Sequence, residues 1–508
     1  MMFSIKKEEI CPDWKRILWL CLPAILVGLL LRAWLMVKMP YCFIQPDSID
    51  LLATPDHLLR KTVWYIAPKK TFLTPILYTL TFFLPFPALT TIAIGQHTLG
   101  LLLILMIGLL SRLWFKQWPF LIPITTLLTA LNPTLLWYEH TLMAESHYVF
   151  CVVLTALAGT LFARYKNPPY FIFFILSLFL TAGSRPEGKL FFAFGLLLTL
   201  CISYRSWRKL AWQLALLLLI GFGTSRLTRS SQAGLLLYTS VVTLTPDSIH
   251  AAPGFESYIL PTRNRLRNEW QYRYSNMAAA RKEISQAVES YLQSQQVNSS
   301  SKAINRFCLK IAIETCMKNV WQLPELASKK FRQTLLKISS GSFDDKWLVE
   351  RQIKTLEGDF NILSRHSKKL TGKTLVELNE YKNFIHHHYQ LPVDNPFLKL
   401  QKTWRNFTNF GVTFSETPST LPPLTPFYWI AIAGFLLLPF IKKDLFLFHL
   451  SWGFMILGLW FVIFLTANTK ERFRFVFEPF WILYLAALLD GLIQIIQSRL
   501  RKNPKVVT

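Results

Sequence analysis

The chain has 508 residues, of which 52% are hydrophobic and only 17% are charged, and the apolar residues lie in long blocks. A soluble chain of this length would usually divide into several patterned domains, so the composition indicates a polytopic integral membrane protein. The formal net charge is +26. Many of the Lys and Arg residues stand just beyond the ends of apolar blocks, which is typical of membrane topology and argues against a nucleic-acid partner.

The first apolar block runs from Ile17 to Met36 and is about twenty residues long, the length that crosses a bilayer. It is too long for a removed signal peptide and lacks the small-residue cleavage site. Arg32 lies inside this block, where a charge is costly unless the side chain snorkels or faces protein. We interpret Arg32 as a structural residue, and the alternative is that it faces a polar cavity.

Ten membrane crossings are predicted from the apolar blocks and their flanking charges. They lie near residues 17–38, 88–113, 119–138, 141–163, 169–184, 188–204, 210–227, 427–441, 445–467 and 475–497. The strongest basic clusters between them then fall on one face, which the positive-inside rule makes cytoplasmic, together with both termini. The expected fold class is therefore all-α, a polytopic membrane helical bundle.

This pattern divides the chain into three parts. An N-terminal membrane module covers residues 1–227 and contains the first extracytoplasmic loop, 40–87. A mostly helical extracytoplasmic domain covers 228–426, and a C-terminal membrane module covers 427–508. We expect the chemistry on the extracytoplasmic side, because the spans mostly form a scaffold.

Three local patterns are predicted within the large domain. Residues 303–338 have helical periodicity, and the polar tract 293–301 is predicted to be a loop. His386, His387 and His388 are interpreted as a solvated run, because contiguous histidines cannot all face one metal ion.

The first candidate motif is Gln45-Pro46-Asp47-Ser48, directly after the first span. A carboxylate held just outside the membrane can act as a general base on an acceptor hydroxyl or amine. The alternative is a helix cap, because Pro-Asp-Ser precedes an apolar segment.

The second candidate motif is a group of cations in the same loop, Arg60, Lys69 and Lys70, before the short apolar stretch 72–86. That stretch is shorter than a membrane span and is predicted to be an interfacial or re-entrant helix. Cations at the start of such a helix suit a lipid phosphate, and the backbone donors of the helix N-terminus suit the same anion. Ordinary attraction to lipid headgroups is the alternative.

The third and fourth motifs lie in later loops. Glu145 stands near the membrane boundary of the fourth span, where an ionisable side chain is a candidate for function. A structural ion pair with Arg185 in the Ser-Arg-Pro-Glu-Gly turn is the preferred alternative for it. Arg472 and Arg474 belong to the charged hairpin between the last two spans, beside Phe477 and Pro479, where they suit phosphate binding.

These motifs, in this order, resemble those of the GT-C superfamily of integral membrane glycosyltransferases. The first-loop acid matches Asp47, and "KKTFLTPILYTL" resembles the interfacial motif of protein O-mannosyltransferases and lipid A aminoarabinose transferases, which would carry Lys70 over as a donor-phosphate contact. "HTLMAESHYVF", "SRPEG" and "ERFRFVFEPF" look like three later loops of that superfamily. Nothing in the resemblance covers residues 228–426.

The resemblance implies an inverting transfer of one sugar from a polyprenyl-phosphate donor to an extracytoplasmic acceptor, namely a lipid, a glycan or a protein. Asp47 would be the catalytic residue together with Glu145, and Arg60, Lys69, Lys70, Arg472 and Arg474 would bind the donor phosphate. A divalent cation stays open as a cofactor, because Ser48 stands where related enzymes carry a second acid. The acids that could replace it are Asp50, Asp56 and Glu145.

Two questions stay open from the sequence. A transporter or flippase of a lipid-linked saccharide is the alternative function, although no repeated halves are found. By analogy with the superfamily, the expected location is a bacterial inner membrane, as part of cell-envelope synthesis. The endoplasmic reticulum is the alternative location.

Overall fold

The computed structural model describes residues 14–48, 50–52, 54–55, 71–115, 119–227, 233–270, 277–326, 343, 345–357, 372–389, 395–408, 426–441, 445–466 and 475–502. Within these ranges the chain is helical, which confirms the all-α prediction. Extended pairing is limited in the described residues to one isolated parallel bridge, between Phe43 and Thr141.

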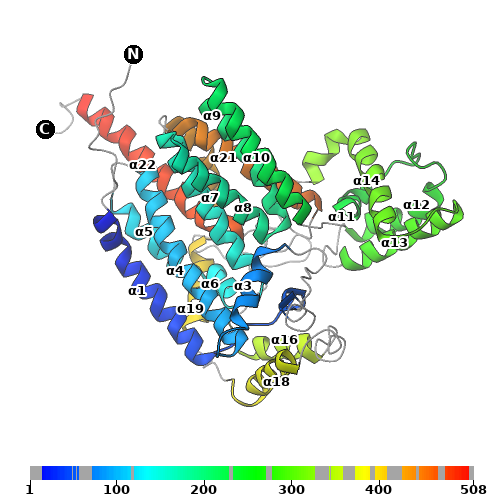
Figure 1. Ribbon diagram of the computed structural model, residues 1–508, viewed down its shortest axis with the longest axis horizontal. Coiled ribbons are helices and arrows are strands. Elements are labelled where there is room, and N and C mark those ends of the chain that lie inside the picture. Colours follow the sequence, from blue (N-terminus) through cyan, green and yellow to red (C-terminus); the bar gives the residue numbers. More distant parts are fainter. Residues whose placement is uncertain are drawn as a thin grey trace.

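A helix or a helix pair occupies each of the ten ranges in which the sequence predicts a span (Figure 1). These elements are α1 (Trp14–Lys38), α4 (Ala88–Trp114), α5 (Leu121–Ala130) with α6 (Pro133–Glu139), α7 (Glu145–Tyr165), α8 (Pro168–Ser184), η2 (Pro186–Leu190) with α9 (Phe191–Ser203), α10 (Trp207–Leu227), α20 (Pro426–Ile441), α21 (Phe446–Thr466) and α22 (Glu478–Lys502). Among the described residues, five helical segments are long and apolar enough to cross a membrane, or six if the bent pair α5 and α6 is one span. The chain is thus an integral membrane protein by the length and composition of its helices.

The range 119–138, predicted as one span, is a helix pair bent by 50°. Asn132 causes the break, because its side chain accepts hydrogen bonds from the backbone N–H groups of Thr134 and Leu135, at 2.9 and 3.2 Å. Pro133 follows at the first position of α6, where the missing N–H is harmless. The bend carries the end of α6 into the interior of the bundle, where Glu139 is buried.

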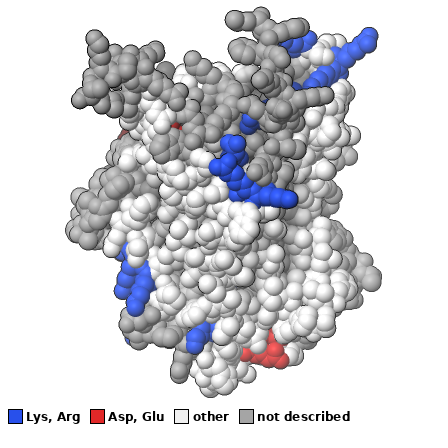
Figure 2. Space-filling view, turned by 90° about the vertical axis from the view of Figure 1, so that its left-hand side faces the viewer, with Lys and Arg blue, Asp and Glu red and all other residues white. Residues whose placement is uncertain are grey.

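The helices of the bundle differ in how much of their surface other helices cover. In the most apolar window of α7, 83% of the residues are buried, against 28% in α1. The uncovered side of α1 carries large apolar residues: Leu18, Leu22, Leu26, Leu29 and Leu30. Figure 2 shows this side of the molecule as a broad surface without charged side chains, with Lys and Arg mainly above and below it. An apolar surface bounded by cations in this way is suited to lipid, so α1 faces the bilayer and α7 is central.

The region between α10 and α20 is helical and packs in two separate places. The helices α11 (Ala233–Val241), α12 (Glu256–Trp270), α13 (Met277–Ser294) and α14 (Ser301–Lys318) share a hydrophobic core of their own. The helices α16 (Asp345–Glu357), α18 (Gly372–His387) and α19 (Pro396–Thr408) bury their apolar residues in the main core of the bundle. This second group therefore contributes residues to the core of the bundle itself.

The local patterns predicted in this region are present in the described residues. The helix α14 covers the first half of the predicted range 303–338 and ends at Lys318, and residues 327–342 lie outside the described residues. The predicted loop 293–301 is shorter, because α13 continues to Ser294 and Ser300 caps α14. The three consecutive histidines are exposed at the end of α18, as predicted.

Glu314 holds a loop onto α14 and makes the stability of this part of the chain depend on pH. Its carboxylate accepts hydrogen bonds from the backbone N–H groups of His250 and Ala251, at 2.8 and 2.7 Å, and lies 2.8 Å from the Lys318 ammonium. Burial raises the pKa of this carboxyl, but Lys318 and the two N–H groups lower it by more, so the net pKa lies below the ordinary value.

We expect acid to loosen the loop around Ala251. A lowered folded-state pKa gives stability that is present above the ordinary carboxyl pKa and is lost as the pH falls through the lowered value. Hydrogen exchange of the amides of residues 249–256 should therefore accelerate as the pH falls, after correction for the intrinsic rate. Glu314→Gln should show fast exchange already at neutral pH, whereas Glu289→Gln on α13 serves as the control. Equal exchange in both variants would contradict this role.

Candidate functional site

The candidate site is a cluster of loops at one end of the bundle, which we call the loop cluster and define as residues 43–48, 72–78, 140–146 and 184–187. Its first contact joins two segments that are about a hundred residues apart in the sequence. The Phe43 N–H donates to the His140 carbonyl at 2.7 Å, and the Leu142 N–H donates to the Phe43 carbonyl at 2.9 Å. The Ser48 hydroxyl adds a bond to the Leu142 carbonyl at 2.6 Å. The segment with Asp47 is thus bonded to the segment that leads into Glu145.

Asp47 stands in a tight turn within this cluster. The Ser48 N–H donates to the Gln45 carbonyl, and the Gln45 N–H donates to the Ser48 hydroxyl, both at 2.9 Å. Pro46 and Asp47 are the two central residues of this turn, a position for which proline is preorganised. Asp47 is half-buried in this turn.

Residues from α16 and α18 cover the same turn. Gln352, which is fully buried, accepts hydrogen bonds from the Ile44 N–H and the Tyr381 hydroxyl, each at 2.7 Å. Arg351 donates to the side-chain oxygen of Gln45 at 3.2 Å. No motif in the sequence pointed to Gln352 or Arg351, because their partners in the turn, Ile44 and Gln45, are 308 and 306 residues away.

Gln96 of α4 joins three parts of the loop cluster. Its side-chain nitrogen lies 2.9 Å from the Ser146 hydroxyl, 3.0 Å from the Tyr78 hydroxyl and 3.1 Å from the Met143 carbonyl. Tyr78 belongs to α3 (Leu73–Thr81), the short helix predicted to be interfacial, and its hydroxyl also donates to the Met143 carbonyl at 2.9 Å. The segment before Glu145 is therefore bonded to both α3 and α4.

Glu145 forms the ion pair with Arg185 that the sequence suggested as its structural alternative. The two groups are 2.6 Å apart, and Glu145 is only 2% exposed. Arg185 also pairs with Glu187 at 3.2 Å and lies 5.7 Å from the ring centre of Tyr148. One guanidinium thus holds two carboxylates, which links the third-loop motif to the Ser-Arg-Pro-Glu-Gly turn.

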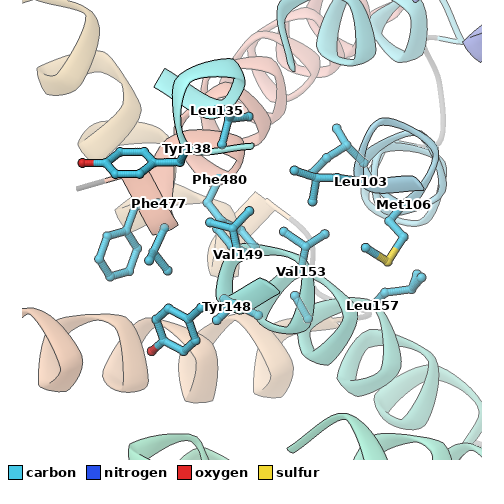
Figure 3. Close-up of a cluster of buried hydrophobic side chains, with 14 of the residues drawn as sticks. Leu103, Met106, Leu135, Tyr138, Tyr148, Val149, Val153, Leu157, Phe477 and Phe480 are labelled. Atoms are coloured by element: carbon cyan, nitrogen blue, oxygen red, sulfur yellow. The ribbon is translucent and has the colours of Figure 1, made fainter. Parts of the chain in front are cut away.

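Residues of the second motif and of the fourth motif also lie near the start of α7. Phe72 lies against Phe179 with ring centres 5.2 Å apart, and it lies so close to Gly183 that any side chain there would meet its ring. Phe477 and Phe480, from the end of the last-loop motif, lie in one apolar cluster with Tyr148 and Val149 (Figure 3). The described parts of all four motifs therefore meet around the start of α7.

The five predicted phosphate-binding cations, Arg60, Lys69, Lys70, Arg472 and Arg474, lie outside the described residues. Their role stays a prediction. Among the residues that the structure describes, no group of three or more His, Cys, Asp or Glu side chains could hold a metal ion.

A buried polar network beneath the loop cluster was not predicted as part of the site. The Arg32 guanidinium donates to both carboxylate oxygens of Glu139 at 2.7 Å. The Oε2 atom of that carboxylate, which accepts from Nε of Arg32, also lies 3.2 Å from Nδ1 of His97, and Nε2 of His97 is 2.9 Å from Nδ1 of His140. Arg32 therefore faces protein, as its structural interpretation requires. The adjacent polar pair Gln96-His97 within an apolar helix was the sequence signal that could have identified this network.

Glycine makes room for the network. A side chain at Gly100 of α4 would collide with the Glu139 carboxylate. A small cavity of about 10 Å³ lies beside the same carboxylate and is lined by Gly100, Tyr138 and Ser146 among others. That volume is close to the minimum for one water molecule. Glu139 of the network and Ser146 of the loop cluster therefore line the same cavity.

Neither a protein-family profile nor any curated protein sequence matches this chain. The interpretation of the site consequently depends on the geometry of the residues described above.

Proposed function

We propose that this protein is a membrane glycosyltransferase of the GT-C type, which transfers one sugar from a polyprenyl-phosphate donor to an acceptor outside the cytoplasm. The observation that carries the proposal is the convergence of the four motifs around the start of α7. Asp47 and Glu145 belong to segments that are hydrogen-bonded to each other, and the other motifs end beside them. Such convergence is what a single catalytic site needs.

In this proposal all ten helical ranges cross a bacterial inner membrane, and both termini are cytoplasmic. Asp47 takes the proton from the acceptor hydroxyl or amine as that atom bonds to the anomeric carbon of the sugar. The bond between the carbon and the phosphate oxygen breaks, and its electron pair leaves with the polyprenyl phosphate. The cations of the second and fourth motifs stabilise the developing negative charge on that phosphate. Glu145, fixed by Arg185, keeps a second carboxylate near the turn.

The test is sugar transfer by the purified chain in detergent, with radiolabelled polyprenyl-phosphate sugars offered together with extracts of envelope acceptors. Loss of label from the donor and its appearance on an acceptor would support the proposal. If the donor stayed intact while the reconstituted protein moved it between the leaflets of vesicles, the flippase alternative would replace it.

We expect alanine at Lys70, Arg472 or Arg474 to weaken donor use roughly tenfold or more each. Charge-assisted contacts to a phosphate contribute about 1.5 to 3 kcal/mol, and every 1.4 kcal/mol is about a factor of ten. The measurement is the dependence of the transfer rate on donor concentration. Lys15→Ala is the matched control, because Lys15 is an exposed cation at the opposite end of α1. Unchanged donor dependence in all three variants would assign these cations to headgroups or topology.

A further inference from the structure

The helix α14 carries apolar side chains on two opposite faces. One face is buried in the core that α14 shares with α11, α12 and α13, through Ile304, Cys308, Ile311, Ala312 and Thr315. The opposite face carries Leu309, Ile313 and Met317, and the 3-10 turn η4 (Val320–Gln322) that follows adds Val320 and Trp321. We call these five residues the α14 stripe. All five are exposed, Met317 by 75% and Trp321 by 91%. A helix in water normally has a polar outer face, so this stripe requires an apolar partner.

The position of the stripe relative to the bundle is fixed by α11. The Asn305 side-chain oxygen accepts hydrogen bonds from the N–H groups of Gly234 and Leu235, at 2.9 and 3.3 Å, so α14 caps the start of α11. A side chain at Gly234 would collide with the backbone of α14, which shows how closely the two helices approach. In turn α11 packs against the bundle helix α21. The stripe is therefore connected to the bundle through α11, which packs against α21.

The residues around the stripe are those of a helix at a membrane surface. Lys302 and Arg306 are exposed and precede Leu309 at helical spacing on the same face. Trp321 stands at the other end of the stripe. Cations along an apolar face and tryptophan at its end are features of helices that lie in the headgroup region.

The other helices of this part of the chain carry polar groups that are suited to water. Arg263 pairs with Asp247 at 2.6 Å, and Arg265 pairs with Glu283. In Figure 1, α11 lies next to the bundle, and α12 and α13 lie farther out. The stripe lies on the face of α14 that points away from the core shared with these helices.

We infer that the α14 stripe enters the lipid bilayer, in the leaflet at the end of the bundle to which α11 is attached. Met317, Ile313 and Leu309 would contact the acyl chains, while Lys302 and Arg306 bind lipid phosphates. Residues 233–326 then rest on the membrane surface beside the bundle. This inference depends on the membrane location of the chain and not on the proposed sugar transfer.

The experiment compares two fluorescent labels on the full-length protein in phosphatidylcholine vesicles. One cysteine replaces Met317 and, in a second variant, one replaces Gln286, which is exposed on α13. Accessible native cysteines are first replaced by alanine, and each single cysteine is labelled with an environment-sensitive dye. Quenching is measured with phosphatidylcholine that carries a spin label on its acyl chain and, separately, with aqueous iodide.

The dye at position 317 is expected to be quenched several times more strongly by the acyl-chain spin label than the dye at position 286, and less strongly by iodide. Equal quenching of the two dyes by both agents would overturn the inference. Protection of position 317 from iodide that persists in detergent and rises with protein concentration would also overturn it, because the stripe would then bind a second copy of the chain. Both positions are exposed, so the labels leave the core intact.

Discussion

Replacing Asp47 by Asn is expected to leave a folded protein that still binds the donor lipid and transfers almost no sugar. Asparagine keeps the size and polarity of the side chain but removes the proton acceptor. A positioned general base is worth roughly a hundredfold to ten-thousandfold in rate. The structure gives this residue a specific advantage, because Asp47 is a central residue of a turn that is bonded to the segment leading into Glu145.

Turnover at saturating donor and acceptor measures the effect, and donor binding is followed separately to establish that the site is intact. Asp50→Asn and Asp56→Asn are the matched controls in the same loop. If Asp47→Asn kept most of its activity and one control lost it, the base would be the other acid. Activity in all three variants would remove the basis for the glycosyltransferase proposal.

Breaking the buried pair of Arg32 and Glu139 is expected to cause the largest loss of stability. Both side chains are at most 5% exposed, and two hydrogen bonds of 2.7 Å join them. Arg32→Met leaves the Glu139 charge in the interior without its main partner, and Glu139→Leu does the same to Arg32. Removal of one member of such a pair typically costs about 3 to 5 kcal/mol.

The double variant Arg32→Met with Glu139→Leu should be more stable than either single variant, because no charge is then left unpaired. Thermal unfolding in detergent, compared across the four proteins, measures this coupling. Lys38→Met is the control, since it removes an exposed cation from the same helix. Additive losses in the double variant would indicate that the two side chains act separately and that His97 is the more important partner of Glu139.

Hydropathy was sufficient to locate the helices of the bundle, because each must cover its polar backbone and present apolar side chains over a fixed length. It did not reveal the break at Asn132, although the Asn-Pro pair is a known start signal for a helix. The mean hydropathy over the length of a span is hardly changed by such a pair, whereas the side chain of Asn132 caps the backbone locally. The sequence therefore predicts the positions of the helices better than it predicts how many of them cross the bilayer.

The site was predictable only where its residues follow each other in the chain. The acid at position 47 and the acid at position 145 could be selected as candidates, since each stands near the end of an apolar block. Their proximity depends on the pairing of Phe43 with residues 140–142, which no local pattern encodes. Gln96 and Gln352 escaped notice for the same reason, because a buried polar side chain acquires its role from partners far away in the sequence.

A hydrogen bond joins the break between α5 and α6 to the start of α22, far away in the sequence. Asn132, which breaks the pair α5 and α6, donates from its side chain to Glu478 at the start of α22, at 3.3 Å. These residues are 346 positions apart. At about 5 to 20 residues per second, the ribosome delivers the second partner roughly 20 to 70 s after the first. During biogenesis the side-chain N–H group of Asn132 therefore stays without this partner in the membrane until α22 is inserted.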